Sequence, residues 1–172
     1  PVPNCHSLNI SELVSAVTSQ NRPFANFEKI DETLEQIQFS HDSLKSKPKY
    51  IVILGIGGSS LGARVLIETL GNRDLLDSNV FFVDSVDPDT IKSVDQNIIY
   101  DQTLFFVVSS SGNTIETLSQ AYFFLDRAES ASIDISRQFQ FIIGNKESEI
   151  FKLALKYSCK IFNWPDNLCG RF

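Results

Sequence analysis

A run of hydroxyl-bearing residues, Ser109 to Thr114, stands between an apolar segment and a segment with helical spacing. It reads Ser-Ser-Ser-Gly-Asn-Thr and continues into Ile115-Glu116-Thr117. Hydroxyls and backbone amides at a helix N-terminus can hold a phosphate without many cationic side chains, because the helix dipole supplies positive potential. Ordinary N-capping accounts for one or two of these hydroxyls, but not for four. The pattern therefore predicts an anion-binding loop.

A second loop, Gly55 to Gly62, reads Gly-Ile-Gly-Gly-Ser-Ser-Leu-Gly and also precedes a helical segment. It lacks the Gly-Lys-Ser/Thr ending of a nucleotide P-loop. It matches the dinucleotide fingerprint at Gly55 and Gly57, but Ser60 stands where the third glycine belongs. Asp84 follows the next apolar segment, as a ribose-binding acid would, but further along the chain than the roughly 20 residues of that fingerprint. A dinucleotide site and a tight turn without a ligand both remain open at this point.

The elements around these loops alternate between apolar runs and helical periodicity. The apolar runs predict strands at 50–54, 79–83, 103–108, 139–143 and 159–162. The segments between them predict helices over 61–70, 88–97, 115–129 and 148–157. This alternation predicts an α/β fold, a three-layer αβα sandwich around a five-stranded parallel sheet of the flavodoxin-like type. Both loops would then lie at the carboxyl ends of strands, where such sheets bind ligands.

The first part of the chain differs from the rest. Residues 1–48 have apolar residues at three- and four-residue steps and predict a helical lead-in packed on the domain. Residues 49–172 would form the α/β domain. The 172 residues, 42% hydrophobic, suit one globular unit and exclude disordered and collagen-like classes. A net charge of −6 argues against nucleic acid and against an anionic membrane surface as the main partner.

The cellular location is inferred from features of the whole chain. Three cysteines without paired spacing indicate reduced thiols, the N-terminus has no signal-peptide pattern, and no apolar run has the length of a membrane span. The prediction is therefore a cytoplasmic protein. The chain contains no Met, not even at position 1, and we expect that it does not begin where its gene begins.

Both loops together resemble the two signatures of a sugar isomerase (SIS) domain, and in detail those of the glucose-6-phosphate isomerase family. The segment Cys169-Gly170-Arg171-Phe172 is similar to that family's Gly-Gly-Arg-aromatic segment. The resemblance implies an SIS fold and the isomerisation of glucose 6-phosphate and fructose 6-phosphate through a cis-enediol. It implies a phosphosugar substrate, no cofactor, no metal and a homodimer in the full-length enzyme. It also implies that this chain is a fragment of a longer enzyme with two SIS domains.

The resemblance also implies roles for individual residues. The residues expected to bind the substrate are Gly58, Ser59, Ser109, Ser110, Ser111, Thr114 and Gly170. Among them, Ser109, Ser111 and Thr114 would hold the phosphate, and Gly58 and Ser59 would line the sugar. Gly170 and the catalytic Arg171 would lie beside C1 and C2, where a guanidinium can face developing enediolate charge.

Two departures from the family pattern stand out. Ser110 occupies a position where the family commonly has Lys, and Cys169 replaces a glycine. The family's catalytic Glu, His and Lys belong to later segments, and His6 and His41 match none of them. We expect this chain to bind sugar phosphate weakly without converting it. The alternatives are a non-catalytic SIS module that senses a phosphosugar, and a nucleotide-binding Rossmann domain.

Overall fold

The computed structural model describes residue 35, residues 47–70 and residues 78–164. Residues 47–70 and 78–164 belong to one compact unit. Most of the expected helical lead-in, both histidines and the segment 169–172 lie outside the described residues. The proposed division into a lead-in and a domain therefore stays a prediction.

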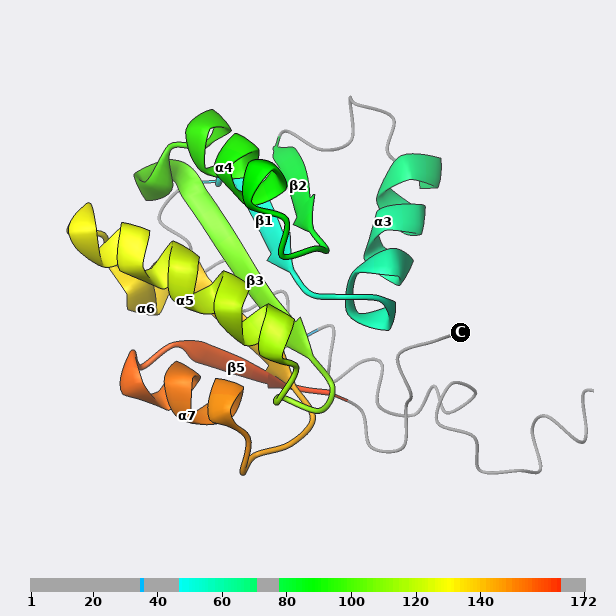
Figure 1. The fold of residues 1–172 in the computed structure, drawn as a ribbon, viewed down its shortest axis with the longest axis vertical. Helices are drawn as coiled ribbons and strands as arrows, with labels where there is room; N and C mark the ends of the chain where they lie inside the picture. Colours follow the sequence, from blue (N-terminus) through cyan, green and yellow to red (C-terminus); the bar gives the residue numbers. More distant parts are fainter. Residues whose placement is uncertain (1–34, 36–46, 71–77, 165–172) are drawn as a thin grey trace, which may run out of the picture. The chain divides into compact units, whose positions relative to one another are not determined.

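Five parallel strands form the sheet, in the spatial order β2-β1-β3-β4-β5. Their bounds are β1 Tyr50–Leu54, β2 Asn79–Val83, β3 Thr103–Ser109, β4 Phe139–Ile143 and β5 Lys160–Asn163. The first strand is paired on both sides, Leu54 opposite Val83 in β2 and opposite Val107 in β3. All five strands match the predicted apolar runs to within one residue at each end, which confirms the parallel α/β prediction (Figure 1).

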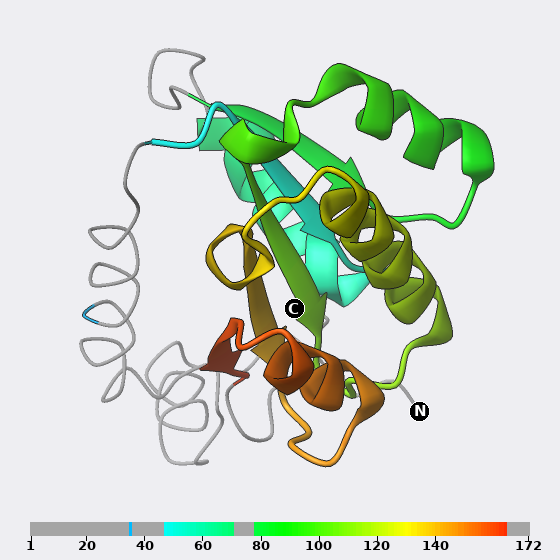
Figure 2. The same ribbon diagram turned by 90° about the vertical axis from the view of Figure 1, so that its left-hand side faces the viewer.

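The helices lie on both faces of this sheet. Their bounds are α3 Gly58–Leu70, α4 Pro88–Asn97, α5 Ile115–Ser130, α6 Ile135–Gln138 and α7 Glu149–Lys156, with a 3-10 turn η3 at Tyr100–Gln102. Right-handed crossovers place α3 on one face, because β2 lies on one side of β1 and the later strands lie on the other. The other face carries α4, α5 and α7 (Figure 2). No helix in the described ranges is both long and apolar enough to cross a membrane.

One boundary prediction was wrong. The helix expected to begin at Leu61 begins at Gly58, so Gly58, Ser59 and Ser60 form its first turn. Gly57 stands just before it with φ +60°, a left-handed conformation that glycine adopts readily. Its carbonyl accepts hydrogen bonds from the amides of Ser60 and Leu61, at 3.1 and 3.0 Å. The turn at Gly57 therefore replaces the longer loop that the glycines and serines indicated.

Two predicted helix starts are confirmed by their caps. Asp87 precedes α4, and its carboxylate accepts a hydrogen bond from the amide of Thr90 at 2.8 Å. This bond and one from the Thr90 hydroxyl lower the pKa of Asp87. Ser148 precedes α7 and its hydroxyl accepts from the amide of Phe151. Each cap satisfies an amide that has no acceptor within its own helix.

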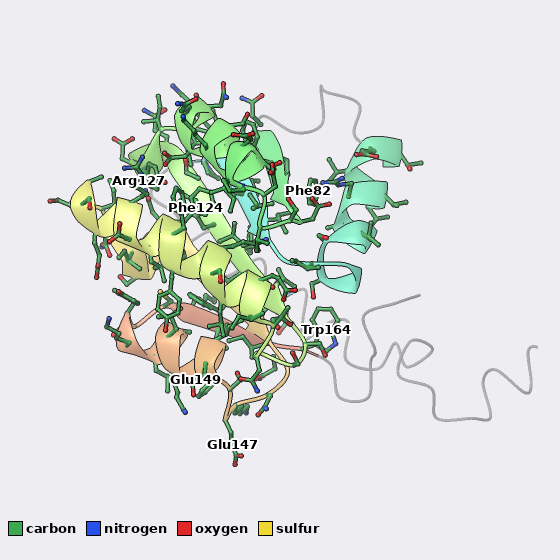
Figure 3. All side chains as sticks on the ribbon, in the orientation of Figure 1. Phe82, Phe124, Arg127, Glu147, Glu149 and Trp164 are labelled. Carbon is green, nitrogen blue, oxygen red and sulfur yellow. The ribbon has the colours of Figure 1, made fainter. Side chains whose placement is uncertain are left out.

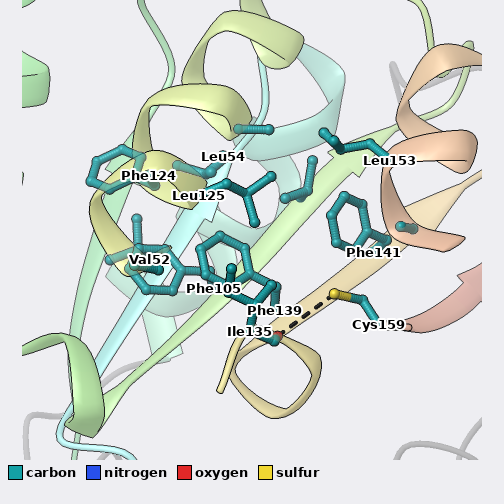
Figure 4. Close-up of a cluster of buried hydrophobic side chains, with 14 of the residues drawn as sticks. Val52, Leu54, Phe105, Phe124, Leu125, Ile135, Phe139, Phe141, Leu153 and Cys159 are labelled. Atoms are coloured by element: carbon teal, nitrogen blue, oxygen red, sulfur yellow. Dashed lines mark hydrogen bonds between the residues drawn. The ribbon is translucent and has the colours of Figure 1, made fainter. Parts of the chain in front are cut away.

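The main core lies on the face that carries α4, α5 and α7. Alternate residues of β1, β3 and β4 point into it, and Phe105 of β3 stands at its centre with no exposed surface. The Phe105 ring stacks on Phe139 with 4.4 Å between centroids and lies 5.5 Å from the Phe124 ring of α5 (Figure 4). The sheet and α5 are thus joined through one aromatic cluster.

Cys159 also belongs to this core, and its thiol donates a hydrogen bond to the carbonyl of Ile135 at 3.6 Å. Burial, together with the charge of Asp134, raises the pKa of the Cys159 thiol from 9.0 to about 12. The thiol is therefore neutral at physiological pH, and a neutral buried thiol is a poor nucleophile.

Removing the central ring should destabilise the whole unit. We expect Phe105→Ala to lower the free energy of unfolding by about 3–5 kcal/mol, because a buried cavity is left between the sheet and α5. Urea denaturation followed by circular dichroism measures this. Leu155 is 58% exposed on α7, so Leu155→Ala should change stability by no more than about 0.5 kcal/mol. Equal losses in the two variants would contradict this account of the core.

Candidate functional site

The two loops singled out in the sequence meet at the carboxyl edge of the sheet. They follow β1 and β3, which are neighbouring strands. The helices that continue from them leave toward opposite faces, so this point is the topological switch of the sheet. Gly55 approaches β3 so closely that an added Cβ would lie 3.0 Å from the carbonyl oxygen of Val108. A side chain at this position would require Val108 or the turn to shift by a few tenths of an ångström, so glycine favours this close approach.

Three of the predicted phosphate-binding hydroxyls converge in the β3–α5 loop. Thr114 Oγ1 lies 3.4 Å from Ser109 Oγ and 3.3 Å from Ser111 Oγ. Ser109 Oγ accepts the amide of Gly112 at 3.0 Å, and Ser111 Oγ accepts the amide of Asn113 at 3.4 Å. Ser109 lies deepest, with 2% of its surface exposed, whereas Ser111 is exposed. We call Ser109, Ser111 and Thr114 the hydroxyl cradle.

Thr114 is the N-cap residue of α5, yet its side chain makes no capping hydrogen bond. Ordinary capping was the alternative explanation for a threonine at this position. Its hydroxyl instead faces the other two cradle hydroxyls. The first amides of α5 therefore have no side-chain cap from Thr114. Glu116, in the first turn of α5, is a favourable charge at the positive end of the helix.

The remaining predicted residues have different surroundings. Gly58 and Ser59 are partly exposed and lie in the first turn of α3, the helix that follows β1. Ser60 is 1% exposed and its hydroxyl donates to the carbonyl of Gly57 at 3.2 Å. Ser110 contributes its carbonyl, which accepts the amide of Gly144 at 3.2 Å. Gly170 and Arg171 lie outside the described residues.

The two loops contain no ionisable side chain, since residues 55–60 and 109–114 are all neutral. Positive potential at this edge comes from the N-termini of α3 and α5 and from loop amides. A charged pair lies beyond it, where Arg64 of α3 contacts Asp84 at 3.0 Å and covers the Phe82 ring. In the described ranges, no group of three or more His, Cys, Asp or Glu side chains could hold a metal ion.

The loop after β4 packs against the β3–α5 loop that carries the hydroxyl cradle, a contact that no sequence pattern indicated. An added Cβ at Gly112, whose φ is +68°, would lie 2.1 Å from Ser148 Oγ. An added Cβ at Gly144 would lie 2.5 Å from the carbonyl oxygen of Ser110. Figure 3 shows the loop that leads into α7 beside the one that leads into α5, with Glu149 marking the first turn of α7. Both glycines are required by close packing between the two loops.

A pair of glycine variants separates backbone strain from packing. Gly57 has φ +60° and nothing within 4 Å of an added Cβ, so Gly57→Ala should cost only about 1–2 kcal/mol of left-handed strain. Gly112→Ala should cost about 1–3 kcal/mol more, because the new methyl group collides with Ser148. Urea denaturation compares the two.

Adding Ser148→Gly to Gly112→Ala removes the colliding atoms, while glycine at an N-cap costs only a few tenths of a kcal/mol. The double variant should therefore recover part of the lost stability. No recovery, or equal losses for the two single variants, would contradict the packing explanation.

Comparison with known proteins agrees with this arrangement. The family profile described as phosphoglucose isomerase matches residues 11–172. A glucose-6-phosphate isomerase of Borreliella afzelii is 36% identical over 130 residues, which are 73% of this chain and 24% of that protein. The corresponding protein of Borreliella burgdorferi is 33% identical over 154 residues, covering 86% of this chain and 29% of its own length. The chain thus spans about a quarter to a third of these relatives.

Solved structures show the same fold. A hypothetical protein from Thermus thermophilus superposes with a TM-score of 0.74 at 26% identity, over 83% of this chain and 34% of that one. A glucose-6-phosphate isomerase from Chlamydia trachomatis superposes with a TM-score of 0.66 at 24% identity, over 97% of this chain and 30% of its own. The sheet order, the two loops at its switch point and the profile match over most of the sequence agree: the chain belongs to the phosphoglucose isomerase family.

Proposed function

We propose that the chain forms the phosphosugar-binding part of an aldose–ketose isomerase acting on glucose 6-phosphate and fructose 6-phosphate. The phosphate lies in the hydroxyl cradle at the N-terminus of α5. The observation that supports this most directly is the N-cap residue Thr114, whose hydroxyl faces Ser109 and Ser111 instead of capping its helix. The family and the SIS-type sheet agree with this proposal.

The hydrogen bonds within the β3–α5 loop leave the cradle hydroxyls able to donate hydrogen bonds to a phosphate. A phosphate ester is close to a dianion at pH 7 and accepts hydrogen bonds only. Ser109 Oγ and Ser111 Oγ already accept backbone amides, so the proton of each hydroxyl can turn from the long contact with Thr114 Oγ1 to a ligand. The three cradle hydroxyls, with the amides at the start of α5, suit a tetrahedral anion without a cation in the loop.

The rest of the substrate would extend from the cradle toward Gly58 and Ser59 in the first turn of α3. By resemblance, Gly170 and Arg171 would lie beside C1 and C2, between which a base moves one proton. The guanidinium would stabilise the negative charge that develops on the enediolate oxygens. A homodimer, a cytoplasmic location and a lack of cofactors stay predictions for the full-length protein.

The nucleotide-binding alternative rested on Gly55, Gly57 and Asp84, and the surroundings of Asp84 count against it. Asp84 was the candidate for the ribose hydroxyls, but its carboxylate is paired with Arg64 at 3.0 Å. A non-catalytic phosphosugar sensor would share the cradle. Isomerase activity of the longer protein distinguishes the sensor from the enzyme.

Thermal denaturation with ligand tests the function. Fructose 6-phosphate at 100 times its dissociation constant should stabilise the fold by about 2.7 kcal/mol. For a chain of this size, that corresponds to a rise in the melting temperature of about 5–10 °C. NAD at the same concentration should leave the melting temperature unchanged. Stabilisation by NAD and none by fructose 6-phosphate would reverse the assignment.

Loss of a single cradle hydroxyl should weaken the binding of fructose 6-phosphate measurably. Ser111→Ala removes one donor to the phosphate, and a hydrogen bond to a charged group is worth about 1.5–3 kcal/mol. The dissociation constant for fructose 6-phosphate, measured by calorimetry, should therefore rise about ten- to a hundredfold. The matched control is Ser119→Ala on α5, whose hydroxyl donates to the carbonyl of Ile115 at 2.8 Å. Unchanged affinity in Ser111→Ala would exclude the cradle as the phosphate site.

A further inference from the structure

The β3–α5 loop, which carries the hydroxyl cradle, is bonded through Asn113 and Gly112 to the N-terminus of α7, a helix that follows a different strand. The amide of Glu149 donates to Asn113 Oδ1 at 3.1 Å, across 36 residues of sequence. The amide of Ile150 donates to the carbonyl of Gly112, also at 3.1 Å. These are the first amides of α7, which lack acceptors within their own helix. The β3–α5 loop therefore serves as a cap for α7.

A third hydrogen bond joins the two segments with the same polarity, from an amide after β4 to an oxygen of the β3–α5 loop. The amide of Gly144, just after β4, donates to the carbonyl of Ser110 at 3.2 Å. The close approach of Gly112 to Ser148 leaves no room for a methyl group between the loops. Backbone groups on both sides and one side chain thus join the β3–α5 loop to the loop and helix after β4.

The helix at this contact is firmly held. Ile150 and Ala154 are fully buried and Leu153 is 4% exposed, all three in the main core. Figure 4 shows Leu153 beside Phe141 of β4 in that cluster. The N-terminus of α7 is therefore fixed by core packing and can act as a reference position for the loop bonded to it.

The side chain of Asn113 differs from those of the cradle residues on either side of it. The hydroxyls of Ser109, Ser111 and Thr114 contact one another or amides of their own loop. Asn113 instead reaches out of the loop to α7. Its own amide donates to Ser111 Oγ at 3.4 Å. One residue thus contacts both the cradle and the anchored helix.

We propose that Asn113 is a positioning residue of the phosphate site, holding the hydroxyl cradle against α7, and that phosphate binding and the docking of α7 are linked. This inference rests on the proposed function. A loop that is already held in its binding conformation binds more tightly, because it loses less conformational entropy when the ligand binds. Linkage is reciprocal: if the Asn113 bond favours phosphate binding, bound phosphate stabilises the start of α7.

The test uses the 172-residue chain, fructose 6-phosphate as the probe, and two measurements. Calorimetry gives the dissociation constant for the wild type, for Asn113→Ala and for a control, Asp87→Ala. Asp87 caps α4 through Thr90 at 2.8 Å, so its loss removes a comparable helix cap away from the cradle. Hydrogen exchange gives the protection of the Glu149 and Ile150 amides with and without the ligand.

We expect Asn113→Ala to raise the dissociation constant about five- to thirtyfold, the size of a typical coupling between two sites. Asp87→Ala should change it less than about twofold, since sites that share no partners act independently. In the wild type, fructose 6-phosphate should slow exchange at both α7 amides, and Asn113→Ala should abolish this slowing. Asn113→Asp retains the acceptor oxygen, so it should keep the Glu149 amide protected in the free protein.

The outcomes separate the two proposals. A wild type that does not bind fructose 6-phosphate overturns the proposed function and this inference with it. A wild type that binds, with equal affinity in Asn113→Ala and Asp87→Ala, overturns the positioning role alone. Unchanged exchange at Glu149 and Ile150 on binding overturns the linkage. This last measurement needs no variant, so it tests the proposal even where Asn113→Ala fails to fold.

Discussion

The pairing of β1 with β3 is the constraint on which the rest of the site depends. These strands are adjacent, Leu54 opposite Val107, although a strand and two helices separate them in the sequence. Their pairing brings the glycine loop beside the hydroxyl loop and sends α3 and α5 to opposite faces. Two helix N-termini therefore approach one point of the sheet edge from opposite sides. The aromatic contacts of Phe105 then join β3 to α5 and β4, and so fix the strand that carries the hydroxyl cradle.

A chain with a net charge of −6 can still offer a site for an anion, because the relevant potential is local. The two loops carry no charged side chain, and Asp84, the acidic residue that follows the neighbouring strand β2, is paired with Arg64. The partial charges at two helix ends and the donors of the loop remain. A cradle made of hydroxyls also contains no buried cation that would need a partner.

Much of the fold and part of the site could be predicted from sequence. Apolar β-branched runs such as Tyr50–Leu54 have few alternatives to a buried strand, and Asp87-Pro88 carries a local signal for a helix start. The start of α3 was misjudged because Gly58, Ser59 and Ser60 have the composition of a loop. In the structure the chain turns at Gly57, and these three residues already belong to the helix. The bond from Glu149 to Asn113 could not be predicted, because it joins residues 36 positions apart and depends on the alignment of two loops.

The N-termini of α3, α5 and α7 lie at this edge of the sheet, and they serve two different purposes. Those of α3 and α5 carry Gly58, Ser59 and Thr114, the residues proposed to face the ligand. The first amides of α7 are satisfied by Asn113, Gly112 and Ser148, so they have no capacity left for an anion. The role of α7 is to position the β3–α5 loop. Its buried face packs in the core, and its N-terminal amides bond to the loop that carries the cradle. A phosphate-binding loop with no cation among residues 109–114 depends on the placement of several weak donors, and each donor contributes fully only when its geometry is set beforehand. The contact between the β3–α5 loop and α7 is the part of this structure that provides such geometry.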